Sequence, residues 1–234
     1  MAVAVTVVVT FSGSKGGTGK TTISVSLSLL CSARVNTLLV DASAEGGATS
    51  YLLGDCPGPY LSQDPARSLR KIAIDEADVR LAVAVNRGPL LNPELVARHI
   101  AEWGRSFQLT LIDLPALTDF DAIKRYMPFF ELADTVLVVT EPSPASLEAS
   151  LYTFGPKRVI IALNQPRPYV KSVVEHYRRV VEWFCKQHGY NYVVVPYDAA
   201  MARLTPSSLR VIMYTSDEYD ACLLYTSPSP RDRG

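Results

Sequence analysis

The stretch SGSKGGTGKTT, from Ser12 to Thr22, decides the fold predicted for this chain. It follows an apolar run, Val3–Phe11, and precedes a helical pattern, Ile23–Leu30. A strand, a glycine-rich loop and a helix in that order form the context of a phosphate-binding loop. Backbone N–H groups of such a loop point into one concavity, and the positive end of the helix adds to their attraction for an anion. The stretch therefore predicts a site for the phosphates of a nucleotide.

Two side chains of this stretch have distinct predicted roles. Lys20 would reach the β- and γ-phosphates of the nucleotide, and the Thr21 hydroxyl would bind Mg²⁺ beside them. The other predicted nucleotide contacts come from the loop and the start of the helix: Gly16, Gly17, Thr18, Gly19 and Thr22. The alternative is a glycine-rich turn that only joins a strand to a helix, but the spacing of glycines, lysine and threonine favours the nucleotide site.

Length and composition predict one α/β domain. The chain has 234 residues, with 23 basic and 23 acidic side chains, so its overall charge does not indicate nucleic-acid binding. The segment CLLYTSPSPRD, residues 222–232, resembles the translation of a sequencing adapter. We therefore expect a domain over residues 1–221 whose natural C-terminus is missing, followed by a non-native tail over residues 222–234. A natural Ser/Pro-rich tail is the alternative.

Apolar runs alternate with helical patterns along the chain. Continuous apolar runs are typical of strands that are covered on both faces, as in a parallel sheet. The sequence thus predicts a three-layer, doubly wound α/β fold with a mostly parallel sheet and helices on both faces. The expected strands are Val3–Phe11, Thr37–Asp41, Arg80–Val85, Leu109–Asp113, Thr135–Thr140, Arg158–Leu163 and Tyr192–Val195.

Three local patterns refine this prediction. Val170–His188 is predicted to be an amphipathic helix that ends at Gly189. Its inner, apolar stripe is predicted to comprise Val170, Val173, Val174, Tyr177, Val180, Val181 and Phe184. Its basic side chains either are simply solvated or contact a DNA backbone. Asn92 before Pro93 predicts a helix start, and Gly54–Ala66 predicts a surface loop.

Lys15 narrows the interpretation of the first loop. The sequence KGGTGKTT, residues 15–22, resembles the deviant Walker A loop of the ParA/MinD family of P-loop ATPases. The resemblance implies that Lys15 is a catalytic residue that crosses a dimer interface to the partner's nucleotide, and that Lys20 also serves catalysis. A loop lysine in solvent is the alternative for Lys15.

The resemblance extends to a second motif at the end of the second strand. Asp41 in LLVDASAEGG matches the first acid of the family's D-x-D motif, which implies a catalytic role, although a helix cap or turn is the alternative. The second acid, which in the family orients the attacking water, is Ser43 here. Glu45 could substitute from a different backbone position. ATP hydrolysis is therefore expected to be slow.

Three further positions match the family. Asp113 in LTLIDLP resembles the Walker B aspartate and would hold Mg²⁺, and Ala116–Asp121 would form the switch that senses the γ-phosphate. Asn164 would hydrogen-bond adenine, and the backbone around Pro196 would line the adenine pocket. The alternatives are a turn-capping role for Asp113 and a turn position for Asn164.

The resemblance implies a ParA-like ATPase of plasmid or chromosome partition. It would use ATP and Mg²⁺, form an ATP-dependent homodimer, bind DNA non-specifically and respond to a small ParB-like partner. The alternatives are a MinD-like protein that acts on a membrane and a nucleotide-controlled binding module that hydrolyses ATP weakly. Iron–sulfur cluster carriage is disfavoured because the cysteines form no CxxC pair. The widely spaced cysteines and the lack of a signal peptide predict a cytoplasmic location.

Overall fold

Eight strands form one sheet in the computed structural model, which describes residues 5–13, 16–74, 77–152 and 154–199. Their order is β3-β4-β2-β5-β1-β6-β7-β8, and all neighbouring strands are parallel except β3 and β4. The strands are β1 (Thr6–Phe11), β2 (Thr37–Asp41), β3 (Leu69–Ile74), β4 (Ala77–Ala84), β5 (Leu109–Asp113), β6 (Thr135–Thr140), β7 (Arg158–Asn164) and β8 (Asn191–Val195).

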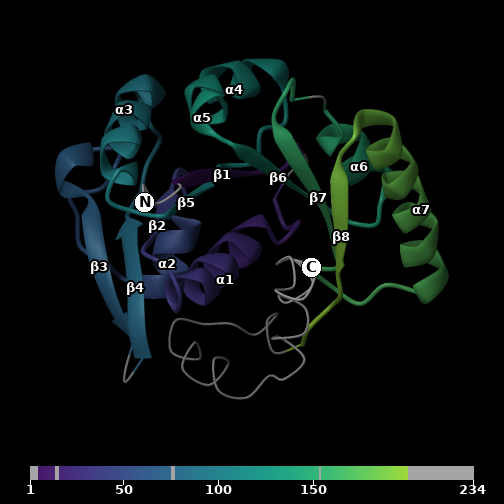
Figure 1. Cartoon of the computed structure of the whole chain (residues 1–234), viewed down its shortest axis with the longest axis horizontal. Helices are drawn as coiled ribbons and strands as arrows, with labels where there is room; N and C mark the ends of the chain where they lie inside the picture. The colour runs from purple at the N-terminus through teal and green to yellow at the C-terminus, as the bar shows by residue number, and fades with distance from the viewer. Residues whose placement is uncertain (1–4, 14–15, 75–76, 153, 200–234) are drawn as a thin grey trace, which may run out of the picture.

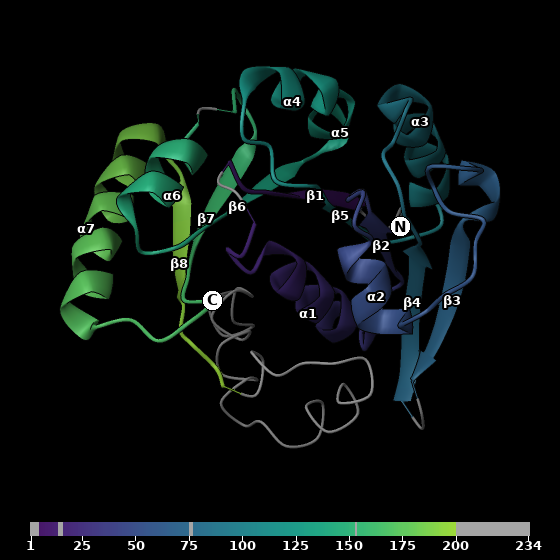
Figure 2. The ribbon, with the colours of Figure 1, turned by 180° about the vertical axis from the view of Figure 1, so that it is seen from behind.

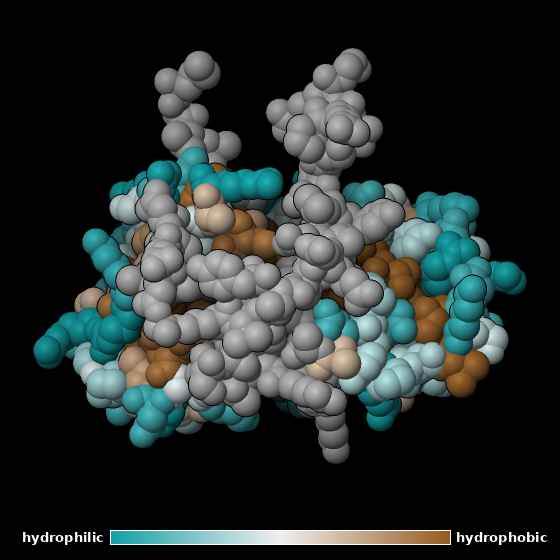
Figure 3. Space-filling model, turned by 90° about the horizontal axis from the view of Figure 1, so that it is seen from below, coloured by the Kyte–Doolittle hydropathy of each residue, from teal (hydrophilic) through white to brown (hydrophobic). Residues whose placement is uncertain are grey.

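Helices cover both faces of the sheet, as Figures 1 and 2 show. On one face lie α1 (Lys20–Ser32) and α2 (Gly47–Leu53). On the other lie α3 (Pro93–Gly104), α4 (Phe120–Arg125), α5 (Met127–Leu132), α6 (Pro144–Ser150) and α7 (Lys171–His188). A short 3₁₀ turn, Pro65–Arg67, precedes β3. Seen from below, hydrophilic side chains gather at the two ends of the molecule and many apolar ones lie nearer its middle (Figure 3).

This architecture confirms the predicted three-layer, doubly wound fold. The strands expected at Thr37–Asp41, Leu109–Asp113 and Thr135–Thr140 have the predicted bounds. β3 was not among the predicted strands, because its LRKIAI sequence mixes charged and apolar residues. Such mixing suits a strand that pairs with only one neighbour at the edge of the sheet.

The predicted inner face of α7 is partly wrong. The helix begins at Lys171, one residue later than predicted, and ends at His188 as predicted, where Gly189 closes it with φ of +68°. However, Val173 and Val180 are exposed, whereas Val181 and Cys185 are buried against the sheet. The buried stripe of the helix therefore runs through Val181 and Cys185, which are four residues apart, and not through all the valines of the predicted stripe.

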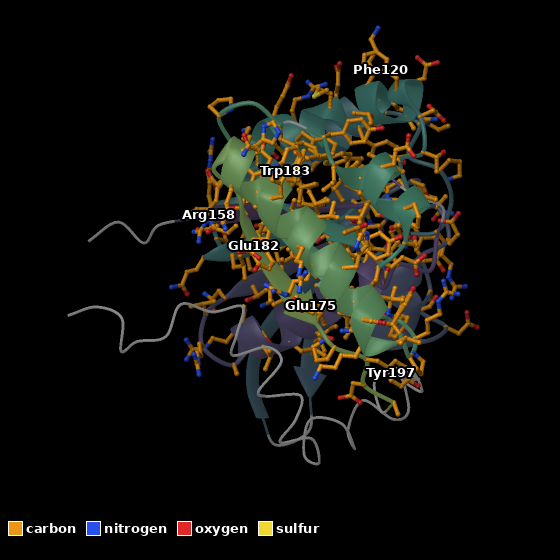
Figure 4. The ribbon with its side chains drawn as sticks, turned by 90° about the vertical axis from the view of Figure 1, so that its right-hand side faces the viewer. Phe120, Arg158, Glu175, Glu182, Trp183 and Tyr197 are labelled. Atoms are coloured by element: carbon orange, nitrogen blue, oxygen red, sulfur yellow. The ribbon has the colours of Figure 1, made fainter. Side chains whose placement is uncertain are left out.

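Three basic side chains of α7, those of Arg178, Arg179 and Lys186, are engaged by acidic ones on the same helix. Arg178 pairs with Glu175 at 2.8 Å and with Glu182 at 3.1 Å, and Lys186 pairs with Glu182 at 3.1 Å. Arg178 also donates to the Tyr192 hydroxyl on β8. Figure 4 shows Glu175 and Glu182 along this helix. These pairs support the solvated interpretation of the face over a DNA contact.

Two other local predictions have different outcomes. The Asn92 side chain accepts a hydrogen bond from the Leu95 N–H at 3.0 Å, which confirms the predicted start of α3. The predicted surface loop Gly54–Ala66 is partly wrong, because Leu61 is buried and its N–H donates to the Val85 carbonyl. Among the described helices, none has both the length and the apolarity needed to cross a membrane.

Candidate functional site

The carboxyl ends of three central strands bring the predicted site together. In the parallel sheet Asp113 on β5 is in register with Asp41 on β2 and with Thr10 on β1. The loop after β1 leads directly into α1. Ligands of open α/β sheets bind at this edge, where neighbouring strands lead their connections to opposite faces.

Gly19 shapes the end of the loop. Its φ of +83° lies in the left-handed region, and α1 begins at the next residue, Lys20. A Cβ at this position would also lie 2.2 Å from Nδ2 of Asn164, so only glycine fits. The Asn164 amide at the end of β7 donates to the Thr18 carbonyl at 2.7 Å. The loop is thus fixed both by its own conformation and by a neighbouring strand.

Lys20 and Asp113 form a buried ion pair at the centre of the site. The ammonium lies 3.2 Å from Oδ1 of Asp113, and the carboxylate has no exposed surface. Ser24 Oγ, one helical turn after Lys20, donates at 3.1 Å to the same oxygen. Within the described part of the chain, Oδ2 of Asp113 is buried without a hydrogen-bond partner. A buried carboxylate oxygen left unpaired is costly, so it marks a place where a ligand would be favoured.

The Asp41 carboxylate is saturated by protein donors. Its Oδ1 accepts from the N–H and hydroxyl of Ser43, at 3.1 and 2.8 Å. Its Oδ2 accepts from the N–H and hydroxyl of Thr49, both at 2.8 Å. Burial and the nearby Asp113 charge raise the pKa of Asp41 to about 6, against the opposing effect of these hydrogen bonds. In this structure Asp41 therefore holds the loop that follows it.

The residues predicted to hold Mg²⁺ fit that ion. Mg²⁺ prefers oxygen ligands and keeps several of its waters, so one hydroxyl and one carboxylate are a suitable protein contribution. Thr21 provides the hydroxyl at the start of α1, and the unpartnered Oδ2 of Asp113 provides the carboxylate oxygen. The Thr21 hydroxyl also lies close to Gly47, where a Cβ would be 3.3 Å away.

The remaining predicted residues lie around the same edge. Gly16 and Gly17 are exposed, and Thr18 and Thr22 follow in the loop and the first turn of α1. Pro196 directly follows β8, whose last residue is in register with Asn164. Lys15 lies outside the described residues, so its role across a dimer interface stays a prediction. The contacts of Asn164 and Pro196 with adenine also stay predictions.

The predicted switch segment starts against the nucleotide loop. The Leu117 N–H donates to the Ser12 carbonyl at 3.0 Å, and Leu117 is buried. Asp119 caps α4 by accepting from the Ala122 N–H at 2.8 Å. The predicted segment Ala116–Asp121 therefore joins the loop after β1 to the first turn of α4, and its role as a switch stays a prediction.

Sequence reasoning missed three buried polar residues of the site. Ser24 supports Asp113, Thr49 supports Asp41, and Asn86 donates through Nδ2 to the Ser43 carbonyl at 2.8 Å. Two signals were present in the sequence. Ser24 follows Lys20 by one helical turn, and Asn86 is a polar residue just after an expected strand. Thr49 could not be predicted from the sequence, because its contact with Asp41 depends on how α2 packs against the end of β2.

Comparison with known proteins finds one curated relative and several solved structures of similar fold. No protein-family model matches the chain. An uncharacterized ATP-binding protein from Methanocaldococcus jannaschii is 30% identical over 150 residues, which cover 59% of this chain. The chain spans about half the length of that protein, since the match covers 56% of it.

Solved structures with the same fold include nucleotide complexes of McdA and MinD and a ParA family ATPase. An ATP complex of a McdA variant from Cyanothece is 15% identical, with a TM-score of 0.69 over 95% of this chain and 97% of the other. MinD from Pyrococcus horikoshii OT3 with Mg-ADP is 17% identical, with a TM-score of 0.68 over 92% and 91%. A ParA family ATPase from Chlorobium tepidum TLS is 19% identical, with a TM-score of 0.68 over 93% and 96%.

Proposed function

Because this chain has the fold of the ParA/MinD P-loop ATPases, we propose that it binds ATP with Mg²⁺ and hydrolyses it slowly in a ParA-like cycle. The observation that carries the proposal is the Lys20–Asp113 pair at 3.2 Å, which lies where a phosphate-binding loop meets the neighbouring strand. The unpartnered Oδ2 of Asp113, among the described residues, supports it. The likeness to an ATP-binding protein is consistent with this site.

Lys20 and Asp113 exchange partners when nucleotide binds. The ammonium of Lys20 turns from the carboxylate to the β- and γ-phosphates, where it offsets their negative charge. Thr21 and Asp113 would hold the ion, Asp113 through the Oδ2 that has no hydrogen-bond partner among the described residues. Mg²⁺ would neutralise charge that develops on the phosphates. The buried pair thus keeps each charge compensated before the ligand arrives.

Slow hydrolysis follows from Ser43. A serine hydroxyl cannot carry the negative charge with which an aspartate orients an attacking water. In addition, the Ser43 hydroxyl already donates to Asp41 at 2.8 Å and accepts from the Gly47 N–H at 3.1 Å. We therefore propose low basal turnover, which an activating partner protein raises.

The proposed cycle includes an ATP-dependent homodimer and a cytoplasmic site of action in plasmid or chromosome partition. Lys15 is proposed to reach the nucleotide of the partner subunit, and non-specific DNA is the proposed surface. The ParA family ATPase among the structural neighbours supports this choice. The ion-paired face of α7 does not support DNA binding, because its Arg178 and Lys186 side chains are already paired with acidic ones. The DNA contact would therefore involve other surfaces.

The MinD neighbour supports a second candidate, a MinD-like ATPase that acts on a membrane. Sedimentation of the protein with DNA or with anionic phospholipid vesicles, each with ATP, separates the two candidates. Phosphate release measured with and without DNA tests a third candidate function, a nucleotide-controlled binding module that hydrolyses ATP weakly. ATP-dependent DNA binding with stimulated turnover supports the ParA-like cycle, and failure to bind ATP would overturn it.

A further inference from the structure

Four buried polar side chains tie the loop after β2 to the rest of the sheet edge. We refer to Asp41, Ser43, Thr49 and Asn86 as the Asp41 cluster; each is at most 6% exposed. Asp41 accepts hydrogen bonds from Ser43 on one oxygen and from Thr49 on the other. The start of the loop and the first turns of α2 are thereby held to the end of β2.

Asn86 closes the cluster from the end of β4. Its backbone N–H donates to the Thr49 hydroxyl at 2.9 Å, and its Nδ2 donates to the carbonyls of Ser43 at 2.8 Å and Gly88 at 3.2 Å. Its Oδ1 accepts from the Ser62 N–H at 3.0 Å. The side-chain amide thus uses both its donors and its acceptor, as a buried amide requires.

The loop held by this cluster lies against the predicted Mg²⁺ ligand. The Gly47 N–H donates to the Ser43 hydroxyl at 3.1 Å, and a Cβ on Gly47 would lie 3.3 Å from Thr21 Oγ1. On the other side, a Cβ on Gly46 would lie 2.4 Å from the Asn86 carbonyl oxygen. The loop is therefore closely packed between Asn86 and the Thr21 hydroxyl.

We propose that Thr49 and Asn86 are positioning residues that fix the Ser43–Gly47 loop beside Thr21 and thereby set the affinity for Mg²⁺-bound ATP. This inference rests on the proposed function. Mg²⁺ demands near-octahedral geometry, so a small movement of the backbone beside its ligand weakens binding of the ion. Residues that act behind a metal ligand typically change metal affinity when they are replaced.

The test compares binding of a fluorescent ATP analogue with Mg²⁺ and with EDTA. Thr49→Val keeps the side-chain shape but removes the hydroxyl that donates to Asp41 and accepts from Asn86. It should reduce the gain in affinity that Mg²⁺ provides by about tenfold or more, with affinity in EDTA nearly unchanged. Thr49→Ser, which keeps the hydroxyl, should restore the gain.

Thr37→Val is the matched control. Thr37 is buried at the opposite end of β2, where its hydroxyl donates to the Val35 carbonyl at 3.1 Å. This variant should keep the wild-type response to Mg²⁺. If Thr49→Val does not fold, Asn86→Asp replaces it, because it removes the donors to Ser43 and Gly88 with little change in size.

Two results would overturn the inference while the proposed function stands. One is a folded Thr49→Val protein whose affinity for the ATP analogue increases with Mg²⁺ as much as that of the wild type. The other is an equal loss of affinity with Mg²⁺ and with EDTA, which a merely structural role would produce. Wild-type protein that binds no ATP under either condition would instead overturn the proposed function, and this inference with it.

Discussion

At the scale of residues, Gly13 lets the loop after β1 pack directly against the backbone of α6, because glycine has no Cβ. A Cβ at this position would lie 1.6 Å from the Ala149 carbonyl oxygen of α6. We expect Gly13→Ala to destabilise the fold by about 1–3 kcal/mol, because the backbone of α6 would have to move. Chemical denaturation measures this change. Gly16→Ala, where a Cβ meets no atom within 4 Å, should change stability by less than about 0.5 kcal/mol. Equal stability of both variants would contradict the packing described here.

Ser43 is the residue that should limit the rate of hydrolysis. Replacing it with aspartate restores an acid at the position where the family's motif has one. We expect Ser43→Asp to raise basal phosphate release on the order of tenfold or more, because a carboxylate can orient the attacking water. Ser43→Asn is the control, since it has a similar size without the charge. If neither variant gains activity, another group positions the water.

At the scale of elements, α7 is stabilised by ion pairs along its own surface, and Arg178 also hydrogen-bonds the Tyr192 hydroxyl on β8. The hydrogen bond from Arg178 to Glu175 lowers the pKa of Glu175 to about 2, well below its ordinary value of 4.5. A depressed folded-state pKa contributes stability above pH 4.5, and this contribution is lost as the pH falls toward 2. Both side chains are partly exposed to solvent, which screens their charges, so the effect is small.

We therefore expect Glu175→Gln to flatten the fall in stability between pH 4.5 and 2. The midpoint of thermal unfolding at several pH values, followed by circular dichroism, measures this difference. If the unfolding midpoint changes with pH equally in the wild type and in Glu175→Gln, the ion pair does not contribute to stability in solution.

The sequence was most informative where a strand is buried on both faces. β2, β5 and β6 are continuous apolar runs, and their bounds were predicted correctly. β3 was not, because an edge strand tolerates charged residues. The same distinction holds in the site. Local spacing predicted a role for Lys20, and the resemblance to a Walker B strand implied one for Asp113. Thr49 and Asn86 are far apart in the sequence and come together only because the chain returns to neighbouring strands.

At the scale of the whole molecule, ATP should join two copies of the chain. Lys15 is predicted to supply the contact between them, because a second cation beside a triphosphate offsets its charge. Light scattering should give about twice the monomer mass with ATP and Mg²⁺, and the monomer mass with ADP. Lys15→Ala should stay monomeric and still bind ATP. A wild-type protein that is monomeric under all these conditions would contradict the dimer.

The most direct test of the central claim is calorimetric titration of the full chain with Mg-ATP. The claim is that Lys20 in the loop after β1 binds the phosphates of ATP. Wild-type protein should show saturable binding with one site per chain, and Lys20→Ala should lose it. Lys171→Ala, which removes an exposed ammonium at the start of α7, should bind like the wild type. Undiminished binding by Lys20→Ala, or no binding by the wild type, would contradict the account.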